Sequence, residues 1–142
     1  MASSAGMASS AFQTVQAAYA AFERRDVPKI FSLFAPEIEI TQSPELPWGG
    51  VYHGHEGARQ FFGKLTGSIT SAVTLERLIE SGDHVIAVGW TQGTVNATGA
   101  AFRVPIAHVW KVEGGLVVQI QFYIDNPTMR VALAGRPASD RS

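Results

Sequence analysis

Few side chains in this sequence could do chemistry by themselves, and two of them stand out. Tyr19 offers a hydroxyl that could donate a hydrogen bond to a bound carbonyl, and Asp125 offers a carboxylate that could act as a general base. Each also has a structural alternative. Tyr19 could be a core tyrosine whose hydroxyl is satisfied within the protein, and Asp125, which precedes Asn126 and Pro127, could cap a helix or turn. The choice depends on where the surrounding elements place these groups.

The histidines invite a metal interpretation, which their spacing does not favour. His53 and His55 flank Gly54, and His108 lies far along the chain with no acidic residue placed alongside. We therefore expect no metal site. The chain has no cysteine, which excludes thiolate nucleophiles, disulfides and zinc or iron–sulfur sites built on cysteine. Glycine-rich phosphate loops, a serine elbow and nucleotide fingerprints are also absent, so we expect no cofactor.

The composition predicts one globular domain without a nucleic-acid or membrane partner. The chain has 142 residues, of which 46% are hydrophobic and 16% charged, and this length is enough to bury a single core. Eleven Lys and Arg against twelve Asp and Glu, spread without runs, form no basic patch. No apolar stretch is long enough to span a membrane, and the first residues lack a signal-peptide pattern. We therefore expect a cytoplasmic protein.

Helical periodicity is strongest near the N-terminus. A first helix, beginning near Ser9 or Ser10, is predicted by aromatic and apolar residues at steps of three and four. These are Phe12, Val15, Tyr19 and Phe22. Asp26 is a typical cap for a short second helix with Pro28 in its first turn. A third helix follows over residues 55–65, and its inner face is expected to carry Ala58, Phe61, Phe62 and Leu65.

The rest of the chain is typical of strands. Ile38 and Ile40 alternate in a short strand. Further strand-like stretches cover residues 73–75, 84–95, 101–112 and 116–125, separated by turn-forming segments. Helices followed by adjacent strands predict an α+β domain with an antiparallel sheet. We place that domain at residues 11–130, between tails at 1–10 and 131–142.

The last hairpin predicts which residues share a face of the sheet. Gly114-Gly115 has the composition of a two-residue turn, which would pair Glu113 with Leu116 and set the register. One face would then be apolar, with the pairs Val109–Ile120, Ala107–Phe122 and Pro105–Ile124. The other face would be mixed, with the pairs Trp110–Gln119, His108–Gln121, Ile106–Tyr123 and Val104–Asp125. This mixed face favours a homodimer interface, and the alternative is a C-terminal tail folded over it.

Three segments together resemble a known family. They are YAAFERRDVPKIFSLFAPEIEI, PWGGVYHGHEGARQFF and HVWKVEGGLVVQIQFYIDN, in this order. Over residues 12–129 the chain is similar to the SnoaL-like and ketosteroid-isomerase-like branch of the nuclear transport factor 2-like superfamily. The resemblance implies a strongly curved antiparallel sheet, closed by three helices of the N-terminal half into a cone-shaped hydrophobic pocket. It also implies that the convex face of the sheet often forms a dimer.

The family's catalytic acids do not match residues of this chain. The steroid isomerases place their proton-shuttling aspartate where Ser43 stands and their oxyanion-stabilising aspartate at Ala107, while their third-helix tyrosine falls on Phe62. The acid on the last strand of SnoaL cyclases and limonene epoxide hydrolases falls at Phe122. The arginine and second aspartate of the epoxide hydrolases fall at Pro105 and Ala107. None of these family reactions therefore finds its carboxylate.

An apolar pocket is still expected. Trp90 aligns with an aromatic pocket residue of the isomerases, and Trp48 lies in a loop rich in proline and glycine at the expected mouth. The residues expected to bind a ligand are Phe22, Trp48, Phe62, Val88, Trp90, Val109, Ile120 and Phe122. For each of them the structural alternative is a place in the core. The orientation of Glu39 stays open, and an inward Glu39 would add a carboxylate.

Three functions fit these observations. The first is a cofactor-free cyclase, isomerase or hydratase that acts on a small hydrophobic carbonyl or epoxide, with Tyr19 or Asp125 as the catalytic group. The second is a non-catalytic binding or accessory protein that uses the same pocket, which the missing acids favour. The third is a purely structural dimer. The residues alone leave open whether the protein is an enzyme.

Overall fold

The N-terminal helices form where their caps and periodicity place them. The computed structural model describes residues 10–135, so the expected tail at 1–10 lies almost entirely outside the described residues. Helix α1 spans Ser10–Arg24 and helix α2 spans Val27–Ser32. Asp26 caps α2, because its side chain accepts a hydrogen bond from the backbone N–H of Lys29. The predicted first and second helices are confirmed.

Six strands form one curved, open sheet. They are β1 (Phe34–Gln42), β2 (Gly50–His53), β3 (Ile69–Ser81), β4 (His84–Val95), β5 (Ala101–Glu113) and β6 (Leu116–Ile124). The strands lie in the order β2-β1-β6-β5-β4-β3. All neighbours are antiparallel except β1 and β6, which are parallel. The α+β class is confirmed, and the sheet is antiparallel apart from this one pair.

Two more helices complete the fold. Helix α3 spans Gly54–Ser68, which confirms the helix predicted over residues 55–65 and extends it, and helix α4 spans Asn126–Leu133. Helix α4 was not expected from the sequence, and its last three residues belong to the segment that was expected to be a tail. Met129 and Ala132 of α4 are buried, so this segment packs on the domain. No helix within residues 10–135 is long and apolar enough to cross a membrane.

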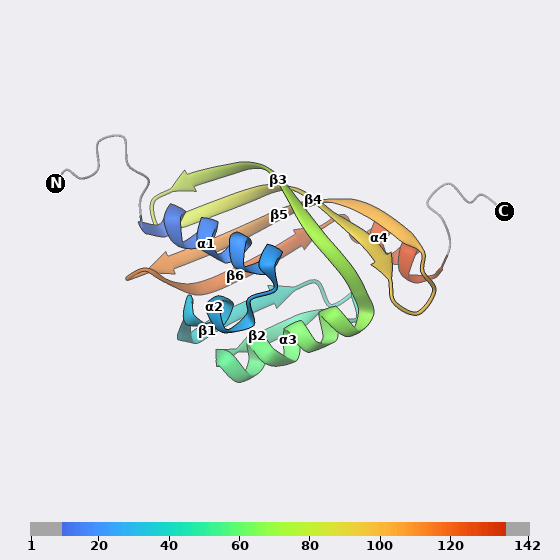
Figure 1. Cartoon of the computed structure of the whole chain (residues 1–142), viewed down its shortest axis with the longest axis horizontal. Coiled ribbons are helices and arrows are strands. Elements are labelled where there is room, and N and C mark those ends of the chain that lie inside the picture. The colour runs from blue at the N-terminus through green and yellow to red at the C-terminus, as the bar shows by residue number, and fades with distance from the viewer. Residues whose placement is uncertain (1–9, 136–142) are drawn as a thin grey trace.

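The three N-terminal helices cover one face of the sheet. Figure 1 shows α1, α2 and α3 on the same side, with the long strand β3 running from the end of α3 across to the far edge of the sheet. Close contact between β3 and β4 depends on glycine. A Cβ at Gly89 would lie 2.1 Å from the backbone oxygen of Thr74, beside a bulge between Leu75 and Arg77. This bulge bends the edge of the sheet.

The register of the last hairpin differs from the prediction. Glu113 pairs with Leu116 as expected, but a bulge then leaves Val118 without a partner, and Lys111 pairs with Gln119. From this point every pair is shifted by one residue, so Trp110 lies opposite Ile120 and His108 opposite Phe122. The predicted mixed face is therefore wrong for β5. His108 and Trp110 are buried under the helices, because a one-residue shift moves a strand's side chains to the other face.

Candidate functional site

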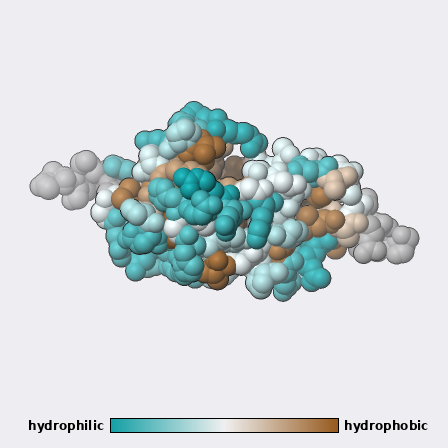
Figure 2. All heavy atoms as spheres, turned by 90° about the horizontal axis from the view of Figure 1, so that it is seen from below, coloured by the Kyte–Doolittle hydropathy of each residue, from teal (hydrophilic) through white to brown (hydrophobic). Residues whose placement is uncertain are grey.

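A large cavity lies between the helices and the concave face of the sheet. Its volume is about 890 Å³, and its walls are mostly apolar. Phe22 of α1, Phe62 of α3 and Phe122 of β6 contribute aromatic walls, and Met129 of α4 is a further lining residue. Figure 2 shows brown, apolar atoms inside a recess in a surface that is otherwise mainly teal and white. Such a hollow suits a flat, mainly apolar molecule.

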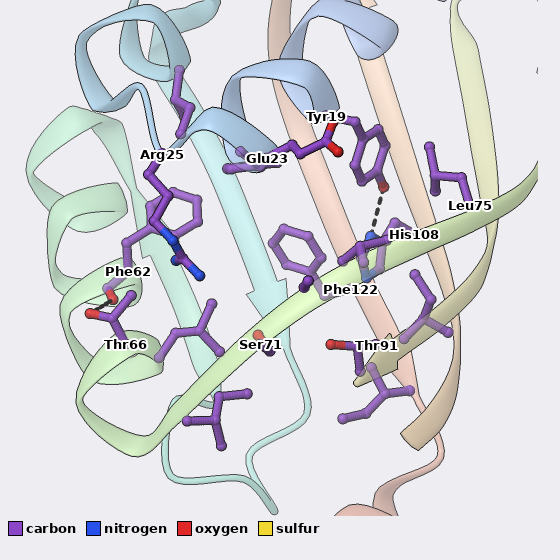
Figure 3. A pocket seen from close by; sticks show the side chains of 18 of the residues that line it. Tyr19, Glu23, Arg25, Phe62, Thr66, Ser71, Leu75, Thr91, His108 and Phe122 are labelled. Carbon is purple, nitrogen blue, oxygen red and sulfur yellow. Dashed lines mark hydrogen bonds between the residues drawn. The ribbon is translucent and has the colours of Figure 1, made fainter. Parts of the chain in front are cut away.

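Three polar side chains meet at the inner side of this cavity, and two of them, Tyr19 and His108, line it. Tyr19 comes from α1, and His108 and Trp110 come from β5. The Tyr19 hydroxyl lies 2.7 Å from Nδ1 of His108, and Nε1 of Trp110 donates a hydrogen bond to the same hydroxyl over 2.9 Å. His108 is 6% exposed and Tyr19 is 9% exposed. Figure 3 shows this pair beside Phe122, facing the hollow.

The hydrogen-bond pattern assigns the imidazole proton of His108 to one nitrogen. The indole N–H can only donate, so the Tyr19 oxygen accepts from it. Among the described residues the hydroxyl has one further polar partner, Nδ1 of His108, and we assign its O–H to donate there because this gives the buried hydroxyl proton an acceptor. The proton of the neutral imidazole then lies on Nε2. The three side chains form a chain of donors that runs from Trp110 through Tyr19 to His108.

Nε2 of His108 opens onto the cavity. It has no hydrogen-bond partner within the described residues, although His108 lines the cavity. The one fully buried side-chain nitrogen or oxygen of residues 10–135 without a partner is Oδ1 of Asn126. Nε2 is therefore not sealed within the protein, and its N–H is free to meet a ligand.

Burial keeps both His108 and Tyr19 uncharged. Desolvation lowers the pKa of His108 to about 3, so the imidazole stays neutral at ordinary pH. Desolvation also raises the pKa of Tyr19 well above its usual value, and the hydrogen bond from Trp110 opposes this only in part. The site therefore offers a neutral imidazole N–H donor held by a protonated tyrosine. A donor of this kind can stabilise negative charge that develops on a substrate oxygen.

Aromatic packing holds the imidazole in place. The rings of His108 and Phe122 meet edge to face, with centroids 4.6 Å apart. Phe122 in turn stacks on Phe61 with centroids 5.2 Å apart, and Tyr19 meets Trp110 at 5.2 Å. These rings come from α1, α3, β5 and β6, so the donor is fixed by several elements at once.

Two charged residues border the cavity. Among the described residues that line it, Glu23 and Arg25 alone carry a formal charge, and both side chains are exposed. Glu23 follows Tyr19 by one helical turn on α1, which places the two on the same side of the helix. In Figure 3 the Glu23 carboxylate lies on the side of Tyr19, and the Arg25 guanidinium lies on the side of Phe62 and Thr66.

The structure places half of the expected ligand-binding residues on the cavity wall. Those that line it are Phe22, Trp48, Phe62 and Phe122. Ile120 is fully buried in the core and does not line the cavity. The remaining three, Val88, Trp90 and Val109, lie on the opposite face of the sheet, so the prediction that they line the pocket is wrong.

The alternation of β4 and β5 explains this error. Ala87 and Thr91 of β4 are buried on the concave side. Val88 and Trp90 lie between these two residues and alternate with them, so their side chains point to the convex side. Trp90 donates from Nε1 to Glu76 over 2.8 Å, and the Arg103 guanidinium lies 3.8 Å from the centroid of the Trp90 ring. These contacts lie outside the cavity. The place of Trp90 in the pocket was assigned by resemblance, and the register of the sheet excludes it.

The expected acids also lie outside the cavity. Asp125 caps α4, because its carboxylate accepts hydrogen bonds from the backbone N–H of Thr128 and from the Thr128 hydroxyl, at 3.2 and 2.9 Å. Asp125 was expected to be either a general base or a cap, and the structure shows the cap. Glu39 lies between the buried Ile38 and Ile40 and accepts a hydrogen bond from Gln119 over 3.0 Å. Its carboxylate therefore faces away from the cavity.

The other histidines are separated from His108. His55 contacts the backbone oxygen of Phe34, and His53 lies 4.0 Å from a Glu39 carboxylate oxygen. Within residues 10–135 no three His, Asp or Glu side chains gather where they could hold a metal ion.

Sequence reasoning missed the residues that give this cavity its polarity. His108 and Trp110 were assigned to the opposite face because the bulge at Val118 carries no glycine or proline to mark it. The available signal was the alternation of large apolar residues along β5, where Phe102, Val104 and Ile106 share the face of His108 and Trp110. Glu23 and Arg25 were not considered, since the end of a surface helix rarely indicates a site.

Comparisons with known proteins agree with this fold. The SnoaL-like domain model matches residues 15–120. A nuclear transport factor 2-like protein of unknown function from Burkholderia pseudomallei has a TM-score of 0.83 and 28% identity, over 89% of this chain and 98% of that chain. Another nuclear transport factor 2-like protein, from Burkholderia thailandensis, has a TM-score of 0.81 and 32% identity over the same shares.

A more distant likeness shows the fold alone. A candidate polyketide cyclase from Pseudomonas putida has a TM-score of 0.77 and 16% identity, over 88% of this chain and 98% of that chain. A search of curated proteins found no match. The family model covers most of the chain, and the fold agrees with it. The chain belongs to the SnoaL-like domain family and has the nuclear transport factor 2-like fold.

Proposed function

We propose that this protein binds a small, flat, mainly apolar carbonyl compound and promotes proton transfer on it without a cofactor, as an isomerase or cyclase would. The observation that carries the proposal is the unpartnered Nε2–H of the neutral His108, which opens onto the cavity. A carbonyl oxygen is the natural acceptor for this donor. The aromatic walls of Phe22, Phe62 and Phe122 suit the rest of the molecule.

The His108 donor acts where charge develops. When a proton leaves the carbon next to a carbonyl, the electron pair of the broken C–H bond moves to the carbonyl oxygen and forms an enolate. A hydrogen bond from Nε2 to that oxygen strengthens as its negative charge grows, and this lowers the barrier. Because Tyr19 and Trp110 already hold the imidazole, the donor needs no reorganisation during the reaction.

Glu23 is the base that the cavity provides. It is the one carboxylate among the described residues that line the cavity, and it lies one turn from Tyr19 on α1. In the proposed reaction the Glu23 carboxylate takes the proton from the carbon and returns it to a different carbon, which completes an isomerisation. In a cyclisation the enolate carbon instead attacks a second carbonyl of the same molecule and forms the ring bond, and the proton goes to the new alkoxide.

A second candidate function is binding without catalysis. The observation that favours it is the exposure of Glu23 at the rim, together with the lack of any Asp or Glu deeper in the described lining of the cavity. A binding or accessory protein would use the same His108 donor and the same walls. The two functions differ in whether a bound carbonyl compound loses a proton.

Hydrogen exchange on a simple probe separates the two functions. We would incubate the protein with 2-tetralone, a flat bicyclic ketone, in deuterium oxide and follow the loss of its α-proton signals by NMR. The proposal predicts exchange faster than in buffer, and a reduction of about tenfold or more in Glu23→Gln and in His108→Phe. The half-buried His84, which lies beside Asp83 and does not line the cavity, offers a matched control, since His84→Phe should not change the rate.

The outcomes of this experiment are distinct. Because Glu23 is exposed, Glu23→Gln tests catalysis without a risk to folding, while thermal unfolding verifies that His108→Phe is folded. Binding of 2-tetralone with exchange no faster than in buffer would contradict the catalytic proposal and favour the binding protein. Failure of the unmodified protein to bind 2-tetralone would contradict both functions.

We also propose that the convex face of the sheet forms a homodimer. The corrected register places an apolar patch there, in which Val88, Ala107 and Tyr123 lie side by side across β4, β5 and β6, next to Ile86 and Val109. Tyr123 is 54% exposed in the single chain. Light scattering at micromolar concentration should give twice the chain mass, and Val109→Glu should halve it. Val27→Glu on α2 is the control, and a monomeric mass for the unmodified protein would contradict the dimer.

A cytoplasmic location stays a prediction from the sequence, as does the lack of a cofactor.

A further inference from the structure

The end of helix α1 has an unusual residue in a common motif. The N–H of Asp26 donates to the backbone oxygen of Ala21 over 2.9 Å, and the N–H of Arg25 donates to that of Phe22 over 3.1 Å. This pair of hydrogen bonds defines a Schellman motif, in which Arg25 takes the left-handed position that glycine normally fills. Its φ is 58°, and it is the one non-glycine residue with positive φ among residues 10–135.

An arginine at this position is unfavourable for the backbone. In the left-handed region any side chain with a Cβ is strained, and glycine is not. The other positive-φ positions of residues 10–135 are all glycine. Backbone strain of this kind is often found at functional sites. The strain alone does not show what Arg25 does. Its function follows from the surroundings of its side chain.

The Arg25 side chain lies at the mouth of the cavity without a counter-ion. Arg25 lines the cavity, and Figure 3 shows its guanidinium directed inward on the side of Phe62 and Thr66. It forms no ion pair with any residue of the described range 10–135. The neighbouring Arg24 differs, because it lies 3.6 Å from a carboxylate oxygen of Asp26.

The nearby carboxylates do not neutralise Arg25. Asp26 uses one oxygen to cap α2 and the other to face Arg24. Glu23, the other charged residue of the cavity lining, lies on the opposite side near Tyr19 and is not within ion-pair distance of Arg25. The cavity thus has an apolar interior, a neutral donor at His108 and an unpaired guanidinium at one side of its mouth.

We propose that Arg25 binds an anionic group, in the first place a carboxylate, on the ligand whose carbonyl group meets His108. The ligand class is then an amphipathic anion with a flat apolar body, a carbonyl at the inner end and a carboxylate at the outer end. This inference rests on the proposed function, because it assumes that the cavity is the ligand site. A planar guanidinium suits a carboxylate, since it can donate two parallel hydrogen bonds to it.

Two matched probes test the assignment. They are 6-acetyl-2-naphthoate and 6-acetyl-2-naphthamide, which share the apolar body and the ketone and differ only in charge at the far end. Titration calorimetry at low ionic strength should show that the unmodified protein binds the carboxylate about tenfold more tightly than the amide. Arg25→Gln should remove this preference by weakening the carboxylate alone, and Arg25→Lys should keep part of it. Arg24→Gln is the control and should leave both affinities unchanged.

Arg25→Gly separates binding from stability. This variant relieves the strained φ, so we expect its thermal midpoint to rise by about 2 °C while the preference for the carboxylate disappears. A structural role for Arg25 would instead lower the midpoint. Because the variant is expected to be more stable, a loss of binding could not be explained by unfolding.

The results that overturn the inference differ from those that overturn the proposed function. The anion site is wrong if the unmodified protein binds the amide as tightly as the carboxylate or more tightly, or if Arg25→Gln leaves the preference for the carboxylate intact. In either case the cavity remains the ligand site. If neither probe binds, both proposals are wrong.

Discussion

The hydroxyl of Tyr19 and Nδ1 of His108 lie 2.7 Å apart and join helix α1 to strand β5. Their hydrogen bond has two consequences. It connects elements that are 89 residues apart in the sequence, and it leaves the imidazole proton on Nε2, at the surface of the cavity. Both the stability of the fold and the proposed chemistry therefore depend on one contact.

Tyr19→Phe should destabilise the protein more than an ordinary tyrosine substitution. It leaves the Trp110 N–H and Nδ1 of His108 buried without their partner, and each loss is unfavourable in a desolvated site. We expect the free energy of unfolding to fall by about 1–3 kcal/mol, measured by denaturant titration. Tyr123→Phe is the matched control, because the Tyr123 hydroxyl makes no hydrogen bond within residues 10–135. Equal stabilities for the two variants would show that the Tyr19 contact is not stabilising.

His108→Gln should change how stability depends on pH. The folded pKa of His108 is about 3, below the ordinary value of 6.5, so only the unfolded chain takes up this proton between these values. The contribution of the neutral His108 is therefore complete above pH 6.5 and is lost as pH falls toward 3. Over this range His108 lowers the free energy of unfolding by at most about 1.4 kcal/mol for each pH unit. Denaturant titrations from about pH 6 down to pH 4 should give a shallower slope for His108→Gln, and parallel slopes would contradict the burial of a neutral imidazole.

Trp90→Ala should leave ligand binding in the cavity unchanged. Trp90 lies on the convex face, where it contacts Glu76 and Arg103. Calorimetric titration with 2-tetralone should give the same affinity as the unmodified protein, within about twofold. Phe122→Ala removes a cavity wall that also packs against His108, so it should weaken binding by at least about tenfold. If the two variants exchanged these effects, the face assignment of β4 would be wrong.

Asp125 should matter for stability and not for catalysis. Its carboxylate caps α4 through the backbone N–H of Thr128. Asp125→Ala should therefore lower the free energy of unfolding by about 1 kcal/mol, while Asp125→Asn, which keeps a cap, should be nearly neutral. Neither variant should slow deuterium exchange of 2-tetralone. A large loss of exchange in a stable Asp125→Asn protein would restore Asp125 as a candidate base.

The fold was predictable to a large extent because its signals are local. The step of Phe12, Val15 and Tyr19 marks α1, Asp26 with Pro28 marks α2, and the turn residues bound the long strands. Strand β2 was missed because four residues beside a loop rich in glycine and proline show no alternation. Helix α4 was missed because the Asp125 cap was recognised without the short helix that follows it.

The candidate site was predictable only in part, and the reason is register. Phe22, Trp48 and Phe62 come from helices and a loop, where one helical stripe or one stiff loop determines the orientation. The strand residues depend on pairing over the whole hairpin, and the unpartnered Val118 reverses the faces of His108 and Trp110. A bulge without glycine leaves no mark in a single sequence.

The imidazole of His108 offers the most direct test of the account. Nitrogen NMR of the histidine ring, recorded at about pH 7 with and without saturating 2-tetralone, reports which nitrogen is protonated and whether it meets the ligand. We predict a proton on Nε2, none on Nδ1, and a shift of the Nε2 resonance on binding. A proton on Nδ1, or an Nε2 resonance that does not respond to a bound ligand, would contradict it.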